Sequence, residues 1–434
     1  MSLDVSRLLD FYKKQVYGDL MPYWMRQIDH EHGGVLNCLS NPGDRLLHDH
    51  KFVWSQGRWA WQTSRIYEES RGKVDEKTRE SYRRTAADTV RFLIDHARLE
   101  NGNCAFVLSR EGKPILLNED GSSRTRRDNE VYDYSISADI FALIGVAEYA
   151  RVMEDAAAYR WAKDLYLSCK RREETGAARS DYPYPIPKGY RSHAKPMGDI
   201  NTGNVIAPAA DTFGDKELAQ AVRNNTDTAV DTVFSRFLQP SGLVLEQIGE
   251  NFQPVNTLLG RYVNPGHTIE DMWFIMHRLM EKEDTGPIEQ IAEISRITLN
   301  KAWDELHGGI PQFMGIDGKQ PQGPVPAELE KHPMVVKLKS LWDKKLWWPH
   351  SEILYTLILL NYLTNQKWIP EAYNRMHEYT FSTFPNPDKS IGEWIQIRDR
   401  QGMPEESVVA LPVKDPMHIV RAFLFAINIL EKSA

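Results

Sequence analysis

The stretch NPGHTIEDMWF (residues 264–274) opens in the same way as DPMHIVRAFLF (residues 415–425). Each begins with Asn or Asp, then Pro, then any residue, then His, and continues as an apolar run with helical spacing. Asn and Asp are favoured N-caps, and Pro fits the first helical position, where its missing N–H costs nothing. The sequence therefore predicts two helices that start alike, each with a histidine, His267 or His418, in its first turn.

Helical spacing extends over most of the chain. It is clear in residues 137–153, 219–238, 288–306 and 351–365, and a looser third start, Trp347-Trp348-Pro349-His350, precedes the last of these. Strand patterns are short, and residues 103–116 and 308–319 are expected to form small β-hairpins around Gly turns. We expect an all-α protein.

A weak internal repeat indicates how these helices are arranged. Residues 29–35 (DHEHGGV) recur as residues 304–310 (DELHGGI), each after a helical pattern. Repeated units favour an array of helical hairpins, and 434 residues suffice for about six of them. No Ser/Gly-rich linker divides the chain. We therefore expect one domain, residues 1–434, built as a closed (α/α)6 barrel of helical hairpins with small β-hairpins in its loops.

Composition excludes several classes of protein. The net charge is −7 and no basic stripe is present, so nucleic acid is not an expected partner. No apolar run is long enough to cross a bilayer or to act as a secretion signal. Three widely spaced cysteines fit neither a disulfide framework nor a zinc site. We expect a protein of the reducing cytoplasm without membrane contact.

The repeated histidines are the first candidates for chemistry. The positive end of a helix dipole disfavours imidazolium, so a histidine in the first turn tends to be neutral and able to accept a proton. Glu270 follows His267 by three residues and shares its helix face, where it could orient the imidazole. A competing interpretation is a metal site formed by His267, Glu270 and His418. A third is that each histidine has a structural role only, as a capping residue of its helix or as a packed side chain.

Four segments together resemble the N-acylglucosamine 2-epimerase family. They are KFVWSQGRWAWQTSRIY (51–67), GRYVNPGHTIEDMWF (260–274), KLWWPHSEILYTLILL (345–360) and GEWIQIRDRQGMPEESVVALPVKDPMHIVRAFLF (392–425). They occur in family order from about residue 8 to 430. The family includes N-acylglucosamine 2-epimerases, cellobiose 2-epimerases and aldose–ketose isomerases acting on mannose or sulfoquinovose. The resemblance implies an (α/α)6 barrel, which agrees with the helical pattern, and often a homodimer.

The resemblance also assigns residues. It implies that Arg58, His267, Glu270 and His418 are catalytic, and that Trp54, Trp348, Glu352, Trp394 and Asn201 bind substrate. Several family members carry a further histidine in the middle of the chain. The corresponding stretch here, residues 196–208, has Asn201 and Asn204 instead, and His193 lies just upstream. The long Pro/Tyr-rich loop before it, residues 171–195, matches no pattern of the family.

These residues predict proton transfer at a carbon beside a carbonyl. One neutral histidine removes the C2 proton of an open-chain reducing sugar, and Arg58 stabilises the enediolate, unless it only stacks on its tryptophan neighbours. A proton returned to the opposite face of C2 gives the 2-epimer; a proton returned to C1 gives a ketose. We expect a sugar 2-epimerase that interconverts N-acylglucosamine and N-acylmannosamine. A cellobiose 2-epimerase and an aldose–ketose isomerase are the alternatives.

This route requires no cofactor and no metal, and ATP is a possible effector by resemblance alone. Two other classes of protein stay open. An (α/α)6 glycoside hydrolase needs two carboxylates across a glycosidic bond, and the candidates are Glu246, Asp271, Glu352 and Glu393. A non-catalytic sugar-binding protein would bind without exchanging the C2 proton.

Overall fold

Inner and outer helices alternate along the chain in the computed structural model, which describes residues 3–118, 120–181, 184–364 and 366–433. The inner helices, buried along most of their length, are α3 (Val53–Glu69), α5 (Ser137–Met153), α7 (Ala194–Thr212), α9 (Pro265–Glu281), α12 (Trp347–Leu363) and α14 (His418–Ser433). The outer ones are α1 (Val5–Lys13), which continues through η1 (Lys14–Leu20) into α2 (Met21–Met25), α4 (Glu76–His96), α6 (Ala156–Glu174), α8 (Lys216–Thr232) with η2 (Val233–Phe237), α10 (Ile288–Ala302) and α13 (Trp368–Thr383).

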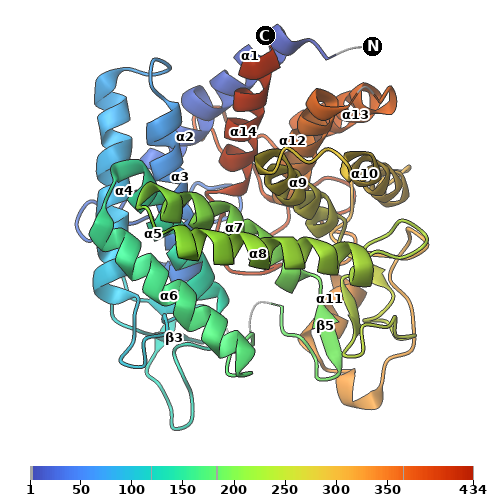
Figure 1. Ribbon diagram of the computed structural model, residues 1–434, viewed down its shortest axis with the longest axis horizontal. Coiled ribbons are helices and arrows are strands. Elements are labelled where there is room, and N and C mark those ends of the chain that lie inside the picture. The colour runs from blue at the N-terminus through green and yellow to red at the C-terminus, as the bar shows by residue number, and fades with distance from the viewer. Residues whose placement is uncertain (1–2, 119, 182–183, 365, 434) are drawn as a thin grey trace.

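The inner helices form a closed ring. Each packs against the next in chain order, and α14 packs back against α3. The ends of the chain meet at this closure, where Figure 1 shows α1 and α14 side by side. The architecture is the (α/α)6 barrel that the sequence predicts. Within the described residues, no helix combines the length and apolar character needed to cross a bilayer.

The inner helices all begin at one end of the barrel. Each of the first five is followed by an outer helix, and that outer helix packs against it and returns the chain. The loops at this end also carry η3 (Ala327–Leu329) and α11 (Pro333–Ser340), which lies beside β5 in Figure 1. Six helix N-termini, each a partial positive charge, therefore face the same end among the described residues.

Short antiparallel strand pairs tie these loops together. They are β1 (Lys51–Phe52) with β2 (Val107–Leu108), β3 (Leu116–Leu117) with β4 (Ser123–Arg124), β5 (Tyr190–Ser192) with β6 (Gln247–Gly249), β7 (Tyr262–Val263) with β8 (Met314–Gly315), and β9 (Lys345–Leu346) with β10 (Ile397–Arg398). A local hairpin forms in residues 103–116, as expected: Leu108 bridges Pro114, and the N–H of Ile115 donates to the carbonyl of Val107. A Gly turn forms in residues 308–319, where the N–H of Gly315 donates to the carbonyl of Lys319. In addition, β2 and β8 pair with strands of the preceding loop. Sequence spacing misses this because the partners are brought together by the ring.

The repeated segments at residues 29–35 and 304–310 form two equivalent clasps. The Nζ atom of Lys51, fully buried, lies 2.9 Å from Oδ2 of Asp29 and donates to the carbonyl of Gly33. Lys345 reaches Asp304 in the same way, at 3.2 Å. Each lysine comes from the strand that precedes an inner helix, so each clasp fixes the start of that helix, α3 or α12. The sequence repeat is therefore a repeat of loop anchoring.

Candidate active site

Trp348, at the start of α12, lies between the two predicted histidines. Its ring centroid is 5.5 Å from that of His267 and 5.4 Å from that of His418. The two imidazoles, which come from the first turns of α9 and α14, are therefore no more than about 11 Å apart. The ring of helices thus brings the two repeated starts to one place, as the sequence predicts.

His267 occupies the position in α9 that the capping argument gives it. The helix begins at Pro265, and the side chain of Asn264 accepts from the backbone N–H of His267 at 3.2 Å. The Nδ1 atom of His267 lies 3.0 Å from Oε2 of Glu246. Burial raises the pKa of Glu246, but the imidazoles of His267 and His193 outweigh burial and lower it to about 2. An ionised carboxylate only accepts, so Nδ1 carries the hydrogen and Nε2 is the atom left to exchange a proton.

His418 is held in the same manner. Oδ2 of Asp415 accepts from the backbone N–H of His418 at 2.8 Å, although regular helix begins only at His418 rather than at Pro416. The Nδ1 atom lies 2.8 Å from Oε1 of Glu352, whose pKa falls because Arg421 and His418 outweigh burial. Glu352, predicted to bind substrate, is fully buried behind His418 and orients it instead.

Glu270 does not orient His267. Its carboxylate pairs with the guanidinium of Arg421, and its Oε1 lies 3.6 Å from Nδ1 of His418. Burial lowers the pKa of Arg421, but Glu352 and Glu270 outweigh burial and raise it. A buried permanent cation is a stronger partner for a carboxylate than a neutral imidazole one turn away, and this overrides the helix-face argument.

Glu270, Glu352 and His418 form a cluster with metal-like spacing. One ligand atom of each lies within 4.8 Å of the others in the described part of the chain. Arg421 already enters this cluster, with Nη2 2.6 Å from Oε1 of Glu352 and 3.2 Å from Nδ1 of His418. A guanidinium therefore stands where a metal ion would have to bind, and His267, the third member of the proposed metal set, binds Glu246 instead.

Arg58 lies one turn into α3 and reaches the start of α14. Its Nη1 donates to Oδ1 of Asp415 at 2.8 Å, and its guanidinium packs against the rings of Trp54 and Phe141, 4.7 and 4.3 Å from their centroids. Those two rings stack on each other, with their centroids 4.8 Å apart. The side chain is 12% exposed. Arg58 packs against aromatic rings, as its structural interpretation expects. Its catalytic role stays a prediction, although it lies beside Asp415, which caps the helix of His418.

Two further predicted residues lie in other surroundings. Trp394 is 1% exposed and packs on Phe384 and Phe423, so the structure gives it a packing position and not one that lines a cavity. Asn201 is partly exposed in the second turn of α7, and its neighbour Asn204 donates to the carbonyl of Phe274. Substrate binding by Asn201 stays a prediction. Tyr182 and Pro183 of the unmatched loop lie outside the described residues.

Sequence reasoning missed four groups that shape the site. They are His193, Glu246, Asp415 and Arg421. Arg421 had a readable signal, since it stands three residues after His418, where Glu270 stands after His267. Glu246 was considered only as a hydrolase carboxylate, because nothing in its local sequence points to a histidine 21 residues away.

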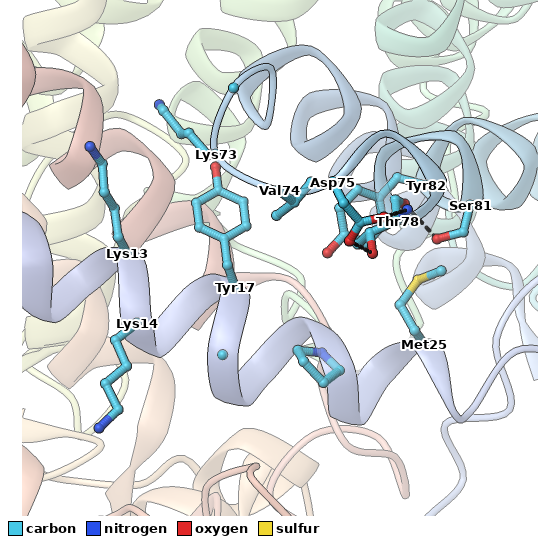
Figure 2. Close-up of a pocket in the computed structure, with 13 residues that line it drawn as sticks. Lys13, Lys14, Tyr17, Met25, Lys73, Val74, Asp75, Thr78, Ser81 and Tyr82 are labelled. Carbon is cyan, nitrogen blue, oxygen red and sulfur yellow. Dashed lines mark hydrogen bonds between the residues drawn. The ribbon is translucent and has the colours of Figure 1, made fainter.

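A surface hollow of about 790 Å³ lies elsewhere, between η1 and α4 (Figure 2). Tyr17, Lys13 and Lys73 line it, and both lysines bind Glu431, at 2.8 and 2.9 Å. None of the residues predicted to be catalytic or to bind substrate lines this hollow, so we assign it no part in proton transfer.

The comparisons with known proteins find relatives over nearly the whole chain. The model of the N-acylglucosamine 2-epimerase family matches residues 34–422. A mouse protein named N-acylglucosamine 2-epimerase is 27% identical over 97% of this chain and 92% of its own length; the human one is 27% identical over 95% and 88%. Among solved structures, a cellobiose 2-epimerase from Bacillus thermoamylovorans superposes with a TM-score of 0.71 at 15% identity, over 98% of this chain and 99% of that one. At that identity the likeness concerns the fold alone.

Proposed function

The chain belongs to the N-acylglucosamine 2-epimerase family, and we propose that it interconverts an N-acylglucosamine and the corresponding N-acylmannosamine by moving the proton on C2. Membership of this family makes the chain a sugar 2-epimerase and so an isomerase. The observation that carries the proposal is the pair of histidines beside Trp348, each with Nδ1 on a carboxylate.

The reaction uses the two Nε2 atoms in turn, one unprotonated and the other carrying a proton. The sugar opens to its aldehyde, which acidifies the C2 proton, and the unprotonated Nε2 of one histidine takes that proton. The electron pair left on C2 moves into an enolate whose negative charge rests on O1. The other histidine, which enters the step as an imidazolium, then gives its Nε2 proton to the opposite face of C2, and the electron pair on O1 re-forms the aldehyde. Exchange of protons with water returns the two imidazoles to their starting states. Two bases on two sides of one carbon are what inversion requires.

The enolate needs a positive environment. Arg58 stays charged in spite of its burial and stands beside Asp415, at the start of the helix that carries His418. The N-termini of the inner helices add fixed partial charges at the same end of the barrel. Both are in place before the reaction begins, so they lower the free energy of the charged intermediate more than that of the neutral sugar.

The N-acylated substrate is supported by the curated relatives, which match over nearly the whole chain and carry that name. The cellobiose and mannose alternatives have only the shared fold behind them. A hydrolase is disfavoured because its candidate carboxylates are committed: Glu246 and Asp271 both bind His193, and Glu352 binds His418. A purely sugar-binding role would not need two carboxylate-backed histidines.

Several finer points complete the proposal. The route needs no cofactor, since both proton transfers are assigned to side chains of the chain itself. A cytoplasmic location, a homodimer and a single domain over residues 1–434 stay predictions. An ATP effector rests on the resemblance alone.

The test is solvent exchange at C2. The protein is incubated in D₂O with N-acetylmannosamine, mannose, cellobiose or sulfoquinovose, and the sugars are followed by proton NMR. We expect N-acetylmannosamine to give N-acetylglucosamine with deuterium at C2, and the double variant His267→Asn/His418→Asn to give neither change. Deuterium in a ketose would instead show an isomerase, reducing ends released from an oligosaccharide a hydrolase, and binding without exchange a sugar-binding protein.

A further inference from the structure

His193 lies behind His267, buried between two carboxylates. Its Nε2 is 2.7 Å from Oδ2 of Asp271, and its Nδ1 is 3.8 Å from Oε2 of Glu246. That same oxygen of Glu246 lies 3.0 Å from Nδ1 of His267. The four side chains therefore form an unbroken row of contacts that ends at His267, whose Nε2 is the proposed proton-transfer atom.

Separate parts of the fold bring these four side chains together. The pairing of β5 with β6 sets Ser192 opposite Gln247, and the next hydrogen bond, from the backbone N–H of His193 to the carbonyl of Glu246, measures 2.9 Å. The packing of α7 on α9 brings Asp271 to the other side of the imidazole. His193, Asp271 and Glu246 are 1%, 0% and 5% exposed, so their charges act on one another with little screening by water.

The other proposed base has a matching arrangement. Behind His418, the carboxylate of Glu352 contacts a guanidinium, that of Arg421, which also pairs with a second carboxylate. Behind His267, the carboxylate of Glu246 contacts an imidazole that also pairs with a second carboxylate. Each base is thus backed by one cationic group and two acidic groups. The difference is that the charge of Arg421 is permanent, whereas that of His193 depends on pH.

Resting on the proposed function, we propose that His193 is a positioning residue for it: held as an imidazolium between Asp271 and Glu246, it fixes the Glu246 carboxylate on His267 and sets the acidic limit of activity. The limit arises because an imidazolium at His267 cannot accept the C2 proton. A cation near Glu246 opposes protonation of His267, so removing that cation moves the limit to higher pH.

The surroundings of His193 favour its charged state. Burial lowers the pKa of His193, but Asp271 and Glu246 outweigh burial and raise it to about 9. Burial raises the pKa of Asp271, which keeps a proton within this pair. Apart from these two carboxylates, the ring of Phe237 lies against His193, 5.8 Å away.

His267 faces Glu246 on one side and uncharged rings on the others. The phenol of Tyr184 and the indole of Trp348 lie 6.4 and 5.5 Å away between centroids, and Lys337 lies 4.5 Å from the ring of Tyr184. The Nδ1 atoms of His193 and His267 are no more than about 7 Å apart, since both contact one oxygen of Glu246. At that separation a buried charge shifts a proton equilibrium by about one pH unit or more.

The experiment compares pH profiles of kcat/KM for C2 epimerisation in four proteins. In His193→Gln the acid limb is expected to move up by about one pH unit, while His193→Lys, which keeps a cation, holds the limb at its wild-type position. His277→Gln is the matched control, because His277 is half-buried on the same helix as His267 and bonds Tyr355. An unmoved limb in His193→Gln, or the same move in His193→Lys, overturns the proposal. A wild-type protein without C2 exchange on any sugar overturns the proposed function instead.

A second measurement decides the matter if His193→Gln does not fold. Histidine-selective ¹⁵N labelling of the wild-type protein distinguishes doubly protonated imidazoles from neutral ones. We expect one buried imidazole that keeps both protons above pH 8, assigned by its loss in the folded His193→Lys protein. Neutral imidazoles throughout at pH 8 would overturn the assignment of His193 as a cation.

Discussion

Glu270 and Arg421 hold the same place in the two repeated helix starts, three residues after His267 and His418, and their side chains form a buried ion pair. The repeat therefore does more than begin two helices alike. It directs the side chains of Glu270 and Arg421, which come from different inner helices, toward each other. The ring of Trp348 meanwhile contacts both histidines.

Replacing Arg421 with Met should destabilise the fold strongly. The change leaves the carboxylates of Glu270 and Glu352 buried without their cation, and breaking such a network costs about 3–5 kcal/mol. The free energy of unfolding, measured with urea, is the readout. Arg296→Met is the control, since the pair of Arg296 with Glu293 is largely exposed and should cost no more than about 1 kcal/mol. Equal losses in the two variants would contradict this view of the pair.

A variant that lacks one of the two histidines should keep proton exchange at one face of C2 and lose epimerisation. His267→Asn and His418→Asn are each expected to lose epimerisation by about 10²–10⁴-fold, because inversion needs both bases. Each should keep slow exchange of the C2 proton with D₂O from one epimer only, and the two variants should retain opposite epimers. Proton NMR of each pure epimer in D₂O checks this. Exchange from the same epimer in both variants would show that the two histidines do not serve opposite faces.

Local physical chemistry was enough to predict the architecture. Capping by Asn264 and Asp415, helical spacing and the repeated clasp segments depend on neighbours in sequence, and the closed ring follows from repeating one unit. Strand pairing depends instead on loops that meet only once the ring is closed. For that reason residues 103–116 and 308–319 showed their turns but not the partners of β2 and β8.

The site was predictable in its proton-transfer groups and not in their partners. His267 and His418 stand out because their helix starts repeat, whereas the carboxylate on each ring comes from another element. The helix-face argument named Glu270 for His267, and the buried guanidinium of Arg421 attracted it instead. Side chains that act across a ring of helices leave no spacing signal in the sequence.

Glu246→Gln should damage catalysis without exposing any new surface. An amide can donate its N–H₂ to Nδ1 of His267, which favours the tautomer whose hydrogen sits on Nε2 and so removes the base. We expect kcat to fall by about 10²–10⁴-fold, and the thermal midpoint to fall as well, because the buried imidazole of His193 loses one of its two carboxylate partners. The control is Glu250→Gln, an exposed glutamate just beyond β6 that accepts from the backbone of Gly189. Full activity in Glu246→Gln would mean that the tautomer is fixed by something else.

Because of the buried pair of His193 and Asp271, the free energy of unfolding should fall as the pH becomes alkaline. The folded-state pKa of His193, about 9, is above its ordinary value of 6.5. The pair's contribution is therefore complete below pH 6.5 and is lost as pH rises through 9. Thermal midpoints of the wild type should fall between pH 6.5 and 9 more steeply than those of His193→Gln. Parallel slopes would show that His193 is not charged in the fold.

Arg58→Lys tests whether a rigid guanidinium is needed for the enolate. Lysine keeps the charge but has no planar fork to hold Asp415 while packing against Trp54 and Phe141. We expect kcat to fall by about 10²–10³-fold with a smaller change in KM, because the oxyanion exists only near the transition state. Arg65→Lys is the matched control, since Arg65 lies on the same helix, pairs with Glu148 and is similarly enclosed, yet lies two turns further from the histidines. A loss of kcat that is the same in both variants would assign Arg58 to the folding of α3 rather than to the chemistry.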